Sequence, residues 1–151
     1  MKFSLMVVVS TGVMFALMYV SAHKLEHVYW SETRFYMALI MGGAMSVIMM
    51  AFMFGMYSSR AINISVLVAG AAIVGIALYL VRSQQTIDDV DWMKAMIPHH
   101  STAILTSERA DLKDARVRRL ADQIIETQRR EIEQMQELIS ELESGGRIVE
   151  R

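Results

Sequence analysis

The chain has 151 residues, of which 54% are hydrophobic, with no cysteine and a formal net charge of −1. The lack of cysteine excludes a disulfide framework and a thiolate metal site, and the lack of a basic excess argues against a nucleic-acid-binding protein. Only six charged residues precede residue 82, namely Lys2, Lys24, Glu26, Glu32, Arg34 and Arg60. This uneven distribution predicts an N-terminal part that lies in lipid and a C-terminal part that lies in water.

Three stretches without a charged residue follow one another in the apolar part, at 3–22, 35–57 and 61–81. Each reaches or exceeds the roughly 20 residues that cross a bilayer core as a helix, and a backbone in lipid must satisfy its own hydrogen bonds. We therefore expect residues 1–82 to form a three-span transmembrane region. The first stretch also has features of a signal peptide, but its apolar length favours a retained span.

In the polar part we expect a linker at 83–87, followed by a water-soluble helical domain at 88–151. Asp88 or Asp89 can cap a helix that runs to about Arg109, and Pro98 should kink it or break its first turns. A turn at 111–114 precedes a second helix that ends before two glycines.

The second helix carries a stripe with the spacing of a helix-bundle seam. Its members are Leu120, Ile124, Gln128, Glu131, Met135, Leu138 and Leu142, and Ile125, Ile132 and Ile139 widen it. Two helices alone make a thin core, so we expect two copies of the chain to pair as a dimer and form a four-helix bundle. The predicted fold is all-α, with three transmembrane helices followed by a soluble helical hairpin that self-associates.

The start of the hairpin gathers side chains that bind soft metals. Met93, Met96 and His100 fall on one face of a helix, and His99 lies three residues after Met96. Imidazole and thioether together suit copper. Folding the hairpin about its turn brings this face toward Met135, a further ligand, and toward two polar residues that could support the ligands, Glu131 and Gln128. The alternative is that the methionines fill the core and a histidine bonds backbone freed by Pro98.

Two patterns carry a family resemblance: Ala95-Met96-Ile97-Pro98-His99-His100 with Ala103-Ile104 after it, and the later series Leu120-Ala121-x-x-Ile124-Ile125-x-x-Gln128-x-x-Glu131-Ile132-x-x-Met135. Over residues 88–142 they resemble the family catalogued as domain of unknown function 305, and the preceding spans resemble its membrane-anchored members.

This resemblance implies a ferritin-like helical fold in a multi-pass protein of the bacterial inner (plasma) membrane, with the C-terminal domain in the periplasm. It also implies copper binding, homeostasis or resistance. The ligands it implies here are Met93, Met96, His99, His100 and Met135. The single hairpin and the few methionines of its tail argue against a store for many copper ions.

Two further patterns lie in the apolar part. A methionine recurs every four residues at Met37, Met41, Met45, Met49 and Met53. This pattern is similar to the second span of trimeric copper transporters, although methionine is also an ordinary packing residue. His23 and His27 are spaced as one helical turn and could bind an additional metal or simply lie at the membrane interface.

The leading hypothesis is a membrane-tethered metal-binding protein that handles copper outside the cytoplasm. The alternatives are a Cu(I) transporter that uses the methionine stripe, and a structural module without metal. We expect no enzyme, because the sequence has no Glu-x-x-His pair, catalytic triad pattern or phosphate loop.

Overall fold

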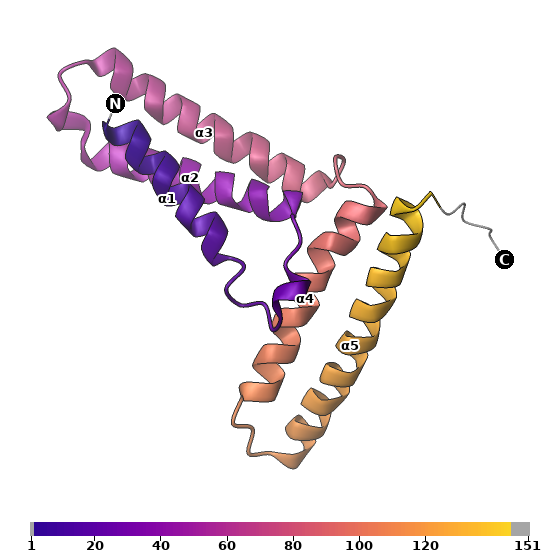
Figure 1. Cartoon of the computed structure of the whole chain (residues 1–151). Helices are drawn as coiled ribbons and strands as arrows, with labels where there is room; N and C mark the ends of the chain where they lie inside the picture. The colour runs from indigo at the N-terminus through magenta and orange to yellow at the C-terminus, as the bar shows by residue number, and fades with distance from the viewer. Residues whose placement is uncertain (1, 146–151) are drawn as a thin grey trace. The chain divides into compact units, whose positions relative to one another are not determined.

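The computed structural model describes residues 2–145, and this part of the chain is entirely helical and irregular, without a strand (Figure 1). The α-helices are α1 (Lys2–Leu17), α2 (Glu32–Phe52), α3 (Arg60–Ser83), α4 (Asp89–Arg109) and α5 (Ala115–Glu143), with short 3₁₀ helices η1 (Leu25–His27) and η2 (Phe54–Met56). The expectation of an all-α protein is confirmed. The chain forms two compact units, one built from α1, α2 and α3, and the other from Tyr19–Ser31, α4 and α5.

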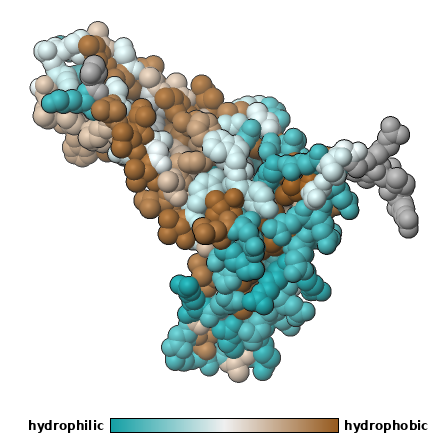
Figure 2. Space-filling view, in the orientation of Figure 1, coloured by the Kyte–Doolittle hydropathy of each residue, from teal (hydrophilic) through white to brown (hydrophobic). Residues whose placement is uncertain are grey.

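In the first unit, α2 packs along α3 and α1 packs on α2. Glycines set how closely α2 and α3 approach each other, since a Cβ on Gly43 would lie only 3.0 Å from the carbonyl oxygen of Gly70. Small residues at such a contact let helix backbones come together. Figure 2 shows hydrophobic residues gathered over these helices and hydrophilic residues over α4 and α5.

Two helices of the described chain, α2 and α3, are long and apolar enough to cross a membrane. Only 22% and 11% of their most apolar stretches are buried within the chain, so most of each stretch is not covered by other residues of the chain. The expectation of three spans is wrong, because α1 has 16 residues and measures about 24 Å at 1.5 Å per residue, less than the ~30 Å of a bilayer core.

The chain leaves α1 earlier than its hydropathy predicts because the residues from Tyr19 onward belong to the second unit. There the carbonyl oxygen of Ser21 accepts a hydrogen bond from Thr102 Oγ1 at 3.2 Å. Hydropathy is a local property, whereas this contact joins residues far apart in the sequence.

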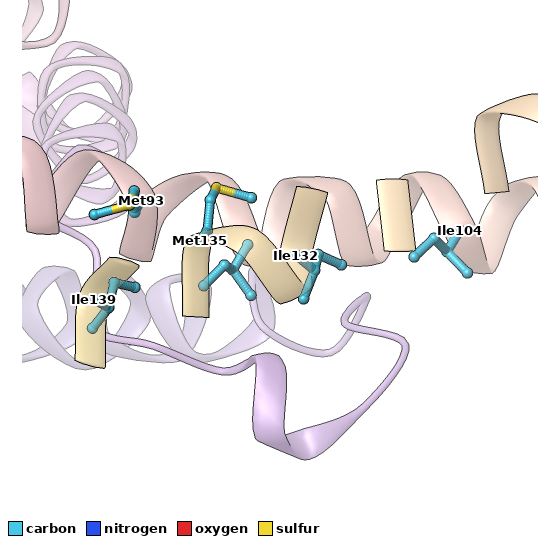
Figure 3. Close-up of a cluster of buried hydrophobic side chains, with 6 residues drawn as sticks. Met93, Ile104, Ile132, Met135 and Ile139 are labelled. Atoms are coloured by element: carbon cyan, nitrogen blue, oxygen red, sulfur yellow. The ribbon is translucent and has the colours of Figure 1, made fainter. Parts of the chain in front are cut away.

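In the second unit, α4 and α5 form a hairpin around a buried apolar cluster (Figure 3). The cluster consists of Met93, Ile97 and Ile104 from α4 with Ile132, Met135 and Ile139 from α5. Asp88 and Asp114 cap the two helices by accepting backbone N–H groups. Helix α4 continues unbroken through Pro98, which is fully buried.

The face of α5 that packs on α4 includes only part of the predicted stripe, since Ile132, Met135 and Ile139 are buried in the cluster but other members are not. Leu120 is 56% exposed, and Ile124 and Leu138 are also exposed, whereas Ala121 and Ile132 are buried. The two possible seams differ by one helical position, which an apolar pattern alone separates poorly. Within the described residues, the segment Tyr19–Ser31 supplies a third element of this core, since Tyr29 packs against the cluster.

Candidate metal-binding site

The contact between α4 and α5 places an imidazole beside a carboxylate. His100 Nδ1 lies 3.4 Å from Glu131 Oε2, and this buried nitrogen forms no hydrogen bond. Gln128 Nε2 donates to the same oxygen at 3.2 Å, so it holds the carboxylate. Burial lowers the pKa of His100, with Glu131 opposing and His99 adding to the effect. A neutral imidazole is the form that binds a metal.

Methionine sulfur lies in the same part of the hairpin. Met135 is buried in the cluster with Met93, and the half-buried Met96 packs against it (Figure 3). Met96 precedes His100 by four residues on α4, and Glu131 precedes Met135 by four on α5, so each pair shares a helix face. Thioether groups therefore lie about one helical turn along the seam from the imidazole and the carboxylate.

His99 lies on another side of α4. It is exposed, and its ring centroid is 6.1 Å from that of His100. In residues 2–145, no three His, Asp or Glu side chains converge as a metal site. A metal on the α4–α5 seam would therefore need thioether sulfur beside imidazole nitrogen.

The predicted pair of His23 and His27 does not lie on one regular helix but in the segment Tyr19–Ser31, where His27 ends η1. His27 Nδ1 lies 2.9 Å from Ser101 Oγ, and that oxygen accepts the backbone N–H of His23 at 2.8 Å. Ser101 is fully buried. The contact occupies one ring nitrogen of His27, so only Nε2 stays available to a ligand.

Both histidines line a cleft of about 430 Å³ between the segment and the hairpin, which Glu133 and Gln136 also line. His23 Nδ1 is buried, forms no hydrogen bond and lies 3.6 Å from Glu108 Oε2. Burial lowers the pKa of His27, and Glu26 opposes this effect. The role of this pair in metal binding stays a prediction.

Sequence reasoning missed Ser101 and Glu108, which hold the segment. The residues before α2, His27-Val28-Tyr29-Trp30-Ser31, show no regular alternation of polar and apolar types, so no sequence pattern indicated this packing. Ser101 directly follows His99 and His100, but nothing in the sequence links a single serine on a helix to a residue 74 positions earlier.

The methionine stripe of α2 faces outward in its first half, where Met37 and Met41 are exposed. A cavity of about 400 Å³ lies among α1, α2 and α3, with Val7, Leu39 and Ile73 in its wall, and none of the described methionines lines it. A copper path along the stripe would therefore need further copies of the chain, and it stays a prediction.

Comparison with known proteins places the hairpin in a described family. The profile described as "Domain of unknown function (DUF305)" matches residues 79–144. The chain is also 38% identical over 109 residues to "Uncharacterized protein L153" of Acanthamoeba polyphaga mimivirus, an alignment that covers 71% of this chain and 70% of that protein. No solved structure matches the chain.

Proposed function

This chain belongs to the DUF305 family, and from that premise we propose that it is a membrane-tethered protein that binds copper on the seam between α4 and α5. The site comprises His100 and Met96 from α4 with Met135 and Glu131 from α5. Gln128 orients the carboxylate, and Met93, on the same face of α4, is a further donor. His99 is exposed on another side of α4 and is not part of this site. The role is copper binding in homeostasis or resistance.

The observation that carries this proposal is His100 Nδ1, which is buried beside the Glu131 carboxylate and forms no hydrogen bond. A buried polar atom without a partner costs on the order of 1–3 kcal/mol, so its persistence suggests a ligand. The group beside it is a Glu131 oxygen held by Gln128, and the thioether of Met135 lies one helical turn farther along α5. Sulfur and imidazole select Cu(I), and imidazole with carboxylate also accepts Cu(II).

The membrane attachment rests on α2 and α3, whose apolar surfaces face outward. In this proposal they cross the bacterial inner membrane, and the hairpin lies on its periplasmic side. The hairpin of a second copy covers the exposed apolar residues Leu120 and Ile124, which gives the dimer.

Copper titration of the whole chain in detergent, by competition with a Cu(I) chelator, tests the proposal. We expect one tight site per chain and a loss of affinity of about 10–100-fold or more in His100→Ala, since even residues that only support ligands have effects of that size. Met56→Leu is the control, because Met56 is exposed and lies in η2 of the other unit. Equal affinity in His100→Ala would contradict the site.

A structural module without metal is the second candidate. Met93 and Met135 are as buried as the isoleucines around them, as core packing alone requires. This candidate predicts that the folded chain ignores copper in the same titration and that Met135→Leu keeps the stability of the hairpin.

A further inference from the structure

The segment Tyr19–Ser31 has two faces. Side chains alternate from His27 to Ser31: His27 is 6% exposed, Val28 41%, Trp30 58% and Ser31 1%, and Tyr29 between them is half-buried. Val28 has an extended backbone, and in extended chain successive side chains point to opposite sides. One side of this stretch therefore faces the protein and the other faces outward.

The inner face binds the hairpin. His27 contacts Ser101, and Tyr29 packs against the apolar cluster while its hydroxyl oxygen accepts a hydrogen bond from Gln136 at 3.4 Å. These contacts reach both α4 and α5, so the segment is fixed to the hairpin as a whole.

The outer face is apolar. Val28 and Trp30 form it, and Leu25, at 92% exposed, adds a third large side chain. The charges of the neighbouring Lys24 and Glu26 pair with each other at 3.0 Å, so they leave no net charge beside this face. Water is a poor environment for three exposed apolar side chains in one short segment.

The short distance along the chain from this face to α2 fixes its position relative to the membrane that α2 crosses. Glu32, the first residue of the apolar helix α2, lies two residues after Trp30, so at most about 7 Å separates their Cα atoms. The polar layer on each side of a bilayer core is about 5–7 Å thick. With α2 in a membrane, Trp30 must therefore lie at or next to the headgroup layer, where tryptophan is enriched.

We propose that the outer face of the segment, formed by Leu25, Val28 and Trp30, lies in the headgroup layer of the bilayer that α2 crosses, and thereby clamps the hairpin to the membrane surface. The partner is the lipid interface of the same membrane. The inference rests on the proposed membrane attachment. It adds a second, non-covalent attachment of the hairpin to the one that the α3–α4 linker provides.

The two tryptophans of the chain are native probes for this proposal. Trp92→Phe leaves Trp30 as the single fluorophore, and Trp30→Phe leaves Trp92. The whole chain is reconstituted in phosphatidylcholine vesicles whose acyl chains carry bromine near the headgroup end or near the methyl end. We expect Trp30 to be quenched at least twofold more by bromine near the headgroup.

Vesicle flotation separates failure of the clamp from failure of the attachment. A chain that floats with the vesicles while Trp30 is quenched no more than free tryptophan would overturn the clamp and leave the membrane attachment standing. A chain that does not float would overturn the attachment and the clamp together. Strong quenching by bromine near the methyl end alone would place Trp30 in the core and also overturn the clamp.

A charge on the outer face gives an independent test. Val28→Asp should reduce the quenching of Trp30 by at least half, because a carboxylate is unfavourable next to acyl chains. Val117→Asp is the matched control, since Val117 is also an exposed valine but lies on α5. Equal quenching of Trp30 in both variants and in the parent chain would contradict the clamp.

Discussion

Ser101 Oγ on α4 lies 2.9 Å from Nδ1 of His27, a residue that precedes it by 74 positions, and both side chains are buried. The contact joins the hairpin to the connection between α1 and α2. The second unit is therefore bipartite in sequence, and the part that matches the DUF305 family, residues 79–144, does not include the docked segment.

The first prediction concerns this contact. Ser101→Ala removes the oxygen that accepts the His23 N–H and contacts the His27 ring. Because buried polar groups then lose their partner, the free energy of unfolding should fall by about 1–3 kcal/mol, measured by urea titration in detergent. Ser140→Ala, at an exposed position of α5, should change it by less than about 0.5 kcal/mol. Equal losses of unfolding free energy in the two variants would show that the Ser101 contact does not stabilise the fold.

The second prediction concerns pH. Burial lowers the pKa of both His27 and His100 below the usual 6.5, so the folded state binds protons less readily than the unfolded chain. The stability from the neutral rings is complete above pH about 6.5 and is lost as the pH falls through the lowered values. We expect a lower unfolding free energy at pH 5 than at pH 7.5.

Variants of the two histidines show how much of this pH dependence each ring causes. His27→Gln and His100→Gln should each remove part of it, and the double variant should remove most of it. A double variant with the full pH dependence would show that other groups are responsible.

The third prediction concerns the face of α5 that packs on α4. Ile132→Ala should destabilise the hairpin by about 2–5 kcal/mol, since it empties a buried site. Leu120→Ala should have a much smaller effect, because Leu120 is exposed. Thermal or urea unfolding compares the two. A larger loss of unfolding free energy in Leu120→Ala than in Ile132→Ala would mean that Leu120 lies in the seam with α4, as the sequence predicts.

How much the sequence could predict follows from these examples. Apolar runs and caps identify the helices, and α4 and α5 begin close to where the aspartates predict. The sequence predicts the middle of the seam, where Ile132, Met135 and Ile139 are buried. It does not predict the choice between Leu120 and Ala121, because both are compatible with an apolar stripe and only packing against α4 distinguishes them. The early end of α1 and the docked segment depend on tertiary contacts such as that of Ser101, which no local pattern contains.

The sequence predicts which residue types form the candidate site but not how they are arranged in space. The spacing predicts His100, Met96 and Met93 on one side of α4, and the structure buries Met93 and leaves His100 facing Glu131. His99 lies on the surface because adjacent residues of a helix point about 100° apart. The sequence could not reveal that His27 is held by Ser101, since their contact requires the fold of the second unit.

The fourth prediction concerns the closest approach of α2 and α3. Gly43→Ala should lower the thermal midpoint in detergent, because the new Cβ would lie 2.9 Å from Val74 Cγ2 and 3.0 Å from the Gly70 carbonyl oxygen. Gly75→Ala is the control, since a Cβ there meets nothing within 4 Å and alanine favours helix. A midpoint that is unchanged in Gly43→Ala would mean that the two helices do not pack through these glycines.

X-ray absorption at the copper edge, on the whole chain loaded with one equivalent of Cu(I), tests the central claim most directly. The account predicts a first coordination shell with both sulfur and imidazole nitrogen, from which sulfur is lost in the Met96→Leu/Met135→Leu variant and nitrogen in His100→Ala. A shell of nitrogen and oxygen alone that these variants leave unchanged, or a folded chain that retains no copper, would contradict it.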